Sequence, residues 1–235
     1  MSKLYEALQQ SEPGRSQPGG GRFVPATPEL TMASRQSMEA LYQSLESALP
    51  GIARKVILFS ASRAGEGTTT IVREFAVTLS LLFRASVLVV DANSNRGAAH
   101  AFGDEKALPL SVLLRSLQAN DANRAMQAGV TVAIFEPDIT NGRTRQLETS
   151  LSIGDALREH FDYVLFDAPA LGSSAMAVSL AHHVDGVVIV IDSERTRWPV
   201  VENTKKTYES TGAKVIGVVL NKRAFHVPQW LYKWL

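Results

Sequence analysis

The stretch Val56-Ile57-Leu58-Phe59-Ser60-Ala61-Ser62-Arg63-Ala64-Gly65-Glu66-Gly67-Thr68-Thr69-Thr70 indicates how this chain is organised. An apolar run leads into a loop of small residues with two glycines, and a helix is predicted from Thr70 to Phe83. Backbone N–H groups of such a loop can surround a phosphate, and the N-terminus of the helix adds partial positive charge. The sequence therefore predicts a phosphate-binding cradle, meaning residues 62–67 and the first turn of the following helix.

This loop departs from the P-loop pattern G-x-x-x-x-G-K-[ST] at its charged position. Ser62 stands at the first glycine position and Gly67 at the second. Thr69 takes the Ser/Thr position that binds Mg²⁺, but Thr68 stands where the lysine belongs. The sequence therefore predicts the architecture of a nucleotide site without its main cation.

Four further apolar runs predict buried strands at residues 87–91, 163–167, 187–191 and 215–221. Between the last two, apolar residues follow helical spacing over residues 200–208, and Gly212 occupies the position of a helix stop. β-Branched runs that alternate with helices predict an α/β fold, a mostly parallel sheet with helices on both faces. Ligands of such sheets bind at the carboxyl ends of the strands. Asp91, Asp167 and Asn221 end their strands at the same edge as the loop.

On these residues the chain resembles the cytoplasmic kinase domain of bacterial tyrosine autokinases from capsule and exopolysaccharide systems, which belong to the MinD/ParA group of P-loop proteins. The resemblance runs from about Ser37 to Leu235. Its motifs are the loop at 64–69, the Walker A′ strand that ends Asp91-Ala92-Asn93, the Walker B end Asp167-Ala168-Pro169, and the closing strand Gly217 to Asn221.

The resemblance implies a MinD/ParA-like P-loop NTPase fold that binds ATP or ADP with Mg²⁺. The implied nucleotide contacts are Gly65, Glu66, Gly67, Thr68, Thr69, Thr70 and, for adenine, Asn221. The implied Mg²⁺ ligands are Thr69, Asp91 and Asp167. In an active member, Asp91 and Asp167 would be the catalytic residues.

Several departures from the family pattern point to lost autokinase activity. Thr68 supplies no charge, and one charge-assisted hydrogen bond contributes about 1.5–3 kcal/mol. Asn93 replaces the second Walker A′ carboxylate. The oligomerisation motif E-x-x-R-x-x-R has neither arginine in the matching stretch Glu39 to Leu45, and the residues after Asn221 hold one tyrosine, Tyr232. We therefore expect a degenerate kinase-like protein that regulates or scaffolds an exopolysaccharide or capsule synthesis and export system.

The composition sets limits on location and partners. The net charge of +1 gives no general attraction to nucleic acid. The chain has no cysteine and no apolar run near the roughly 20 residues of a membrane-spanning helix. We expect a cytoplasmic protein that reaches the inner membrane through a partner. The resemblance implies that this partner is the cytoplasmic segment of a polysaccharide co-polymerase of the chain-length regulator type, and it leaves open a homo-oligomer.

Three regions are expected along the chain. Residues 1–10 form a short docking segment, residues 11–30 a flexible Gly/Pro linker, and residues 31–235 the kinase-like domain with an aromatic C-terminal tail. Leu4, Tyr5 and Leu8 at one end, and Trp230 and Trp234 at the other, either dock on a partner or fold back on the domain.

Two alternatives share the same fold. An active autokinase would tolerate Thr68 by recruiting Arg63 to the phosphates. A MinD/ParA-like positioning ATPase also needs the P-loop lysine, and it often carries a second lysine near the start of the loop, where this chain has residues 61–63.

One alternative belongs to another class, a dinucleotide-binding oxidoreductase. Gly65-x-Gly67-x-x-Thr70 loosely matches G-x-G-x-x-G, and Asp91 follows at about the ribose-binding distance. Asp167-Ala168-Pro169 has no role in such an enzyme, and no hydride-transfer pair is apparent.

Overall fold

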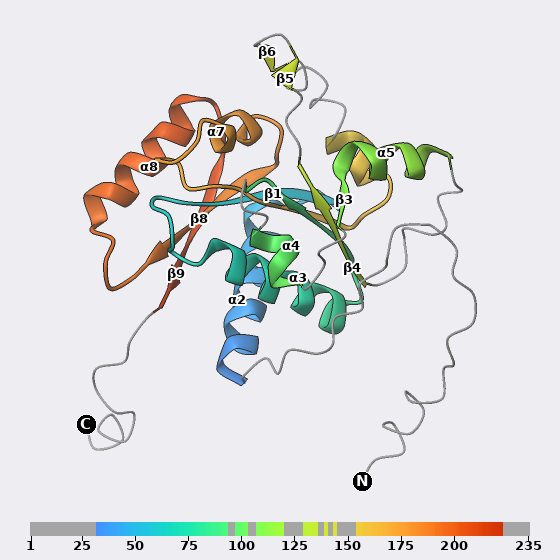
Figure 1. Ribbon diagram of the computed structural model, residues 1–235. Helices are drawn as coiled ribbons and strands as arrows, with labels where there is room; N and C mark the ends of the chain where they lie inside the picture. Colours follow the sequence, from blue (N-terminus) through green and yellow to red (C-terminus); the bar gives the residue numbers. More distant parts are fainter. Residues whose placement is uncertain are drawn as a thin grey trace.

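A parallel sheet forms the centre of the molecule (Figure 1). The computed structural model describes residues 32–93, 97–102, 107–119, 129–135, 139–140, 143–144 and 154–222. Within these ranges the sheet has seven strands in the order β3-β4-β2-β7-β1-β8-β9, and every pair is parallel. The strands are β1 (Lys55–Ala61), β2 (Ser86–Asp91), β3 (Leu108–Pro109), β4 (Gly129–Ile134), β7 (Tyr163–Asp167), β8 (Gly186–Asp192) and β9 (Val215–Asn221).

Helices cover both faces of this sheet (Figure 1). One face packs against α2 (Met32–Ala48), α3 (Thr68–Phe83) and α4 (Gly97–Ala101). The other packs against α5 (Leu110–Ala119), α7 (Met176–Ala181), α8 (Trp198–Ser210) and a helical segment at residues 154–158. Because the strands between these two cores are buried on both faces, they read as continuous apolar runs.

The predicted fold class is confirmed, and each predicted strand lies within one residue of its observed bounds. The prediction that residues 215–221 are buried was wrong, because β9 is an edge strand whose residues are partly or fully exposed. The helix that was expected from Thr70 begins at Thr68, and the helix at residues 200–208 is α8. Strands β3 and β4 and helix α5 were not predicted. A small antiparallel pair, β5 (Ile139–Thr140) and β6 (Arg143–Thr144), flanks the Asn141-Gly142 dipeptide.

Helix α2 is fixed against its own domain along one face. Leu45 is only 3% exposed within the core, and the ring of Tyr42 stacks on Phe83 with the centroids 3.8 Å apart. The Glu46 carboxylate accepts hydrogen bonds from the Tyr163 hydroxyl at 2.6 Å and the Lys55 ammonium at 2.9 Å. Positions 42 and 45, where the family motif carries arginines, therefore pack inward in this chain.

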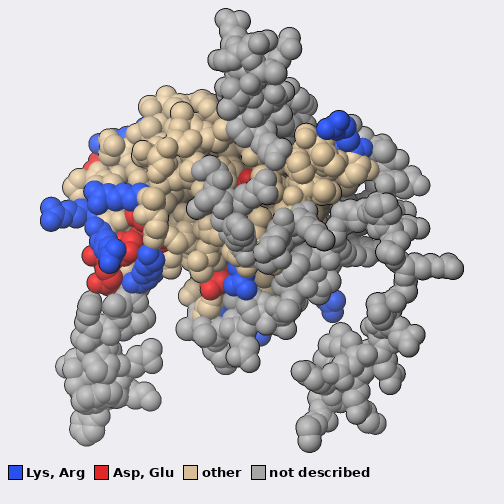
Figure 2. Space-filling view, in the orientation of Figure 1, with Lys and Arg blue, Asp and Glu red and all other residues tan. Residues whose placement is uncertain are grey.

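The ends of the chain, residues 1–31 and 223–235, lie outside the described residues, so the proposed docking segment, linker and tail stay predictions. Among the described helices, none combines the length and apolar character needed to cross a membrane. Figure 2 shows basic and acidic atoms side by side at the end of the molecule formed by α8 and β9. The α8 pairs Lys206–Glu202 and Lys205–Glu209 join charges of opposite sign there, at 2.8 and 3.5 Å.

Candidate functional site

The cradle joins β1 to α3, and glycine is required at its turn. Gly65 and Gly67 have φ angles of 84° and 94°, in the left-handed region that disfavours a side chain. A Cβ atom on Gly67 would also lie 2.1 Å from the amide nitrogen of Asn221. Gly67 precedes the first turn of α3, so the loop delivers the N-terminus of this helix to the carboxyl edge of the sheet.

Thr69 and Asp167 meet at this edge. The Thr69 hydroxyl donates a hydrogen bond to Asp167 Oδ2 at 2.7 Å. Asp91 and Asp167 are partners in the register of adjacent strands β2 and β7, and both are buried. Burial and, to a lesser degree, the nearby Asp91 carboxylate raise the pKa of Asp167 to about 7. Asp167 Oδ1 is buried and has no hydrogen-bond partner among the described residues, which leaves it available to a cation.

The predicted Walker A′ residues are tied to the backbone. Asp91 accepts hydrogen bonds from the amides of Asn93 and Ala99, at 3.0 and 2.9 Å. The Asn93 side chain donates to the carbonyl of Asp167 at 3.1 Å. Asn93 thus holds the end of β7 through this hydrogen bond. Because its side chain is neutral, the negative charge at the site comes from Asp91 and Asp167.

The cradle offers ligands for the metal of a magnesium nucleotide, but it offers no cation for the phosphates. Thr69 and Asp167 present the hydroxyl and carboxylate oxygens that Mg²⁺ accepts, and phosphate oxygens would complete its coordination. No group of three His, Cys, Asp or Glu side chains suited to a metal occurs in the described part of the chain. Thr68, 8% exposed at the start of α3, brings no cation to the β- and γ-phosphates.

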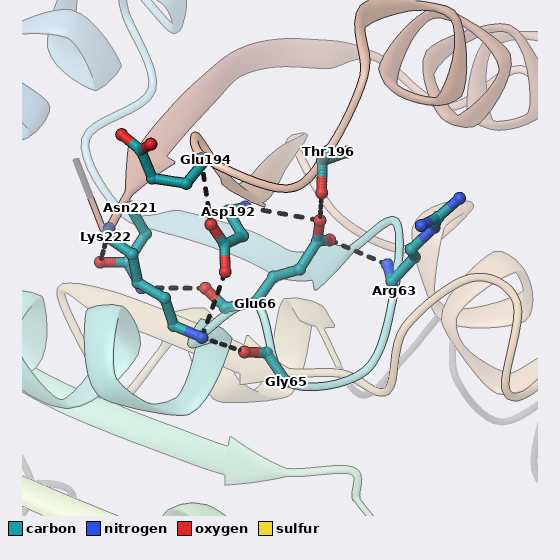
Figure 3. A network of polar contacts seen from close by, with 8 residues as sticks. All are labelled: Arg63, Gly65, Glu66, Asp192, Glu194, Thr196, Asn221 and Lys222. Carbon is teal, nitrogen blue, oxygen red and sulfur yellow. Dashed lines mark hydrogen bonds and ion pairs between the residues drawn. The ribbon is translucent and has the colours of Figure 1, made fainter. Parts of the chain in front are cut away.

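Glu66 was predicted to contact the nucleotide, but its carboxylate forms hydrogen bonds within the protein (Figure 3). It is 3% exposed and accepts hydrogen bonds from the amides of Arg63 and Asp192, at 2.8 and 3.4 Å, and from the Thr196 hydroxyl. These bonds join the loop to the segment that follows β8. Any contact of Glu66 with a nucleotide would therefore come from its backbone.

Two residues at the end of β9 hold the loop from the other side (Figure 3). The Asn221 amide donates to the Glu66 carbonyl at 2.9 Å, and the Lys222 ammonium donates to the Gly65 carbonyl at 2.5 Å. Lys222 also lies 3.5 Å from Asp192 Oδ2. The side chain of Arg63, considered above as a replacement cation, points away from this network.

Lys222, Asp192 and Thr196 were not predicted from the sequence. Lys222 directly follows the predicted Asn221, and this adjacency was its only signal in the sequence. Asp192 and Thr196 lie 126 and 130 residues from Glu66, so no local spacing could join them to it. Ser62, at the first glycine position, accepts a hydrogen bond from Thr204 of α8 at 3.0 Å.

Comparisons with known proteins agree with these motifs. The tyrosine-protein kinase CpsD of Streptococcus agalactiae is 25% identical over 178 residues, which are 73% of this chain and 76% of that protein. The tyrosine-protein kinase YwqD of Bacillus subtilis is 24% identical over 223 residues, 92% of this chain and 90% of that protein. No protein-family model matches the chain.

Solved structures place the fold in the same group. The kinase domain of the Escherichia coli tyrosine kinase ETK superposes with a TM-score of 0.69 at 18% identity, covering 97% of this chain and 91% of that domain. The septum site-determining protein MinD of Pyrococcus horikoshii, solved with Mg-ADP, has a TM-score of 0.52 at 19% identity and covers 77% and 76%. At these identities the structures show the fold alone.

The resemblance to bacterial tyrosine autokinases, and through them to the MinD/ParA group, is thus confirmed. The chain is tyrosine-kinase-like in sequence over most of its length and has a P-loop NTPase fold. The roles of the individual site residues stay predictions.

Proposed function

We propose that this protein is a degenerate tyrosine-kinase-like P-loop protein, and that it regulates or scaffolds an exopolysaccharide or capsule synthesis and export system. In this proposal the cradle binds ATP or ADP with Mg²⁺ weakly or not at all. Thr69 and Asp167 would hold the metal beside Asp91, and Asn221 would contact adenine.

One observation carries the proposal. Thr68 begins α3 inside a loop whose glycines, Thr69 and Asp167 are otherwise in place. The position that would neutralise the transferring phosphate is therefore filled by a neutral side chain, although the glycine turn and the contact between Thr69 and Asp167 are formed. Removing a preorganised charge from a phosphoryl-transfer site typically lowers the rate about a hundredfold or more.

The packing of α2 supports a change in assembly. Leu45 is buried in the core, and Tyr42 stacks on Phe83 of the same chain. Neither side chain can offer a charge to a neighbouring copy. We therefore expect no arginine-mediated oligomer through this helix. A homo-oligomer through another surface stays open, and the proposed partner remains the cytoplasmic segment of a co-polymerase.

Two other functions fit the same fold. An active tyrosine autokinase would need another cation. The Lys222 ammonium contacts a carbonyl of the loop, whereas the Arg63 side chain points away from it. A MinD/ParA-like ATPase is favoured only by the fold. Neither explains why Thr68 and Asn93 replace the charged residues of the pattern.

Phosphopeptide mass spectrometry tests the loss of kinase activity. The full chain is incubated with ATP and Mg²⁺, alone and with the cytoplasmic segment of the candidate co-polymerase, beside Asp91→Ala as the matched inactive variant. The proposal predicts no phosphotyrosine in the wild type or in Asp91→Ala, with or without the co-polymerase segment. Phosphate on Tyr232 that disappears in Asp91→Ala would show an active kinase.

A further inference from the structure

Two consecutive carbonyl groups of the loop are held by the end of β9. Lys222 binds the carbonyl of Gly65 and Asn221 binds the carbonyl of Glu66. The Lys222 side chain is 47% exposed, and Asp192 Oδ2 lies within ion-pair distance of its ammonium. The lysine backbone has a φ of 56°, and its amide donates to Asn221 Oδ1 at 2.8 Å. The two side chains therefore form a compact clamp on the loop.

Peptide geometry links this clamp to the phosphate side of the loop. The peptide bonds of the loop are trans, and in a planar trans peptide the C=O and the N–H point in opposite directions. With the carbonyls of Gly65 and Glu66 turned toward β9, the amides of Glu66 and Gly67 must turn away from it. Successive amides next to left-handed residues form a nest, a concavity that binds anions.

The clamp also changes the strength of these donors. A cation that binds a carbonyl polarises the peptide, and hydrogen bonds along such a chain strengthen one another. An ammonium behind the loop thus makes the amide in front of it a better donor to a phosphate. A second observation points to a charged ligand beside the nest: Asp167 Oδ1 is buried and unpartnered within the described residues, while Asp167 Oδ2 contacts Thr69 in the first turn of α3.

We propose that Lys222 is a positioning residue for phosphate. It fixes the amides of Glu66 and Gly67 in the anion-binding orientation, and so partly compensates for the missing P-loop lysine without entering the cradle. The ligand class is the diphosphate or triphosphate of a nucleotide, and its phosphate groups suffice for the effect. This role rests on the proposed function, since it concerns the same loop.

Titration calorimetry with Mg²⁺ and three probes tests the role of Lys222: pyrophosphate, ADP and adenosine. The full-length chain is compared with Lys222→Met, Lys222→Arg and Lys214→Met. Lys214 is the matched control, because it lies at the other end of β9 and also donates to a backbone carbonyl, that of Ala48 at 3.0 Å. Backbone amide NMR of residues 63–68 without ligand gives a readout that does not depend on binding.

We expect Lys222→Met to weaken pyrophosphate and ADP by the same factor, on the order of tenfold, which one charge-assisted hydrogen bond can supply. Adenosine binding stays unchanged, Lys222→Arg restores most of the loss, and Lys214→Met resembles the wild type. In the free protein, the Glu66 and Gly67 amide signals broaden in Lys222→Met at an unchanged melting temperature.

Three results would overturn the role of Lys222. They are unchanged ADP affinity in Lys222→Met, an equal loss for adenosine, and no binding of pyrophosphate or ADP by the wild type at millimolar concentration. These failures differ from failure of the proposed function. If the wild type binds ATP with sub-micromolar affinity and Lys222→Met weakens this binding, the site is not degenerate but the role of Lys222 holds. If the wild type binds ATP weakly and Lys222→Met leaves the affinity unchanged, the degeneracy holds and the role of Lys222 is wrong.

Discussion

Asn221 lies directly against Gly67, so close that a methyl group on Gly67 would come within 2.1 Å of the Asn221 amide nitrogen. The two residues stand at opposite ends of the domain sequence, one after the first strand and one at the end of the last. Their contact, with the hydrogen bond from Asn221 to the Glu66 carbonyl, closes the loop on the sheet edge. The shape of the cradle is therefore a tertiary property, held by β9 as well as by the loop itself.

Gly67→Ala should destabilise the protein more than Gly65→Ala. Both glycines have left-handed φ angles, so each alanine costs on the order of 1–2 kcal/mol of backbone strain. Of the two, only Gly67 has neighbours within 4 Å of the added methyl group: Lys222 Cε lies at an ordinary contact distance of 3.9 Å, whereas the Asn221 amide nitrogen lies at 2.1 Å. Urea unfolding measures both variants, and Asn221→Ala in the Gly67→Ala background should recover the difference. Equal losses for the two glycines would mean that Asn221 does not constrain the loop.

Asp167→Asn should raise the melting temperature at pH 8 and lose this advantage toward pH 4. The pKa of Asp167 is raised from 3.8 to about 7 in the folded protein, mainly by burial. A raised carboxyl pKa means that the folded state binds the proton more tightly, so wild-type stability is fully present at low pH and falls as pH rises through 7. Asparagine carries no such charge, and its gain at pH 8 should reach a few kcal/mol, or several degrees.

The control for this experiment is Asp155→Asn, whose side chain is 84% exposed. Its melting temperature should follow that of the wild type within about a degree across the same pH range. A gain for Asp167→Asn that is equal at pH 8 and pH 4 would contradict the assignment of the buried charge to Asp167.

Leu45→Arg should destabilise the domain and should not create an oligomer. Leu45 is 3% exposed in the core, and an unpaired charge at such a position costs several kcal/mol. Thermal unfolding and light scattering after gel filtration measure the two effects, with the exposed neighbour Ser44→Arg as the control. A stable, larger assembly in Leu45→Arg would show that α2 still carries the family interface.

Deleting either end of the chain should show whether that end docks on a partner or belongs to the fold. We expect deletion of residues 1–10 or of residues 228–235 to leave the melting temperature unchanged and to abolish capture by the co-polymerase segment in at least one case. Truncations that both melt lower and still bind the partner would show that the ends belong to the fold.

The sequence was sufficient for the features that depend on local pattern. Buried β-branched runs predicted β1, β2, β7 and β8, because a strand covered on both faces must be apolar at every position. The apolar run of β9 predicted the strand but not its partial exposure at the sheet edge. The rule that strands end at one edge then brought Asp91, Asp167 and Asn221 to the loop. Thr69 and Asp167, 98 residues apart, are indeed hydrogen-bonded.

Other features depend on contacts that no spacing records. Strand β4 is GVTVAI, in which the buried Val130 and Val132 alternate with the more exposed Gly129 and Thr131, and it was not predicted. Glu66 belongs to a familiar loop motif, which suggested a ligand contact, yet its carboxylate turns to the amide of Asp192. Lys222 became a candidate only when the structure placed its ammonium on Gly65, 157 residues away.

Calorimetry of ATP and Mg²⁺ binding to the wild type and Thr68→Lys tests most directly whether the cradle is formed but lacks its cation. Ser210→Lys, which adds the same charge at the exposed end of α8, is the control. We expect weak wild-type binding, an affinity at least about tenfold higher in Thr68→Lys, and no change in the control. Equal affinities for the wild type and Thr68→Lys, or sub-micromolar ATP binding by the wild type, would contradict this expectation.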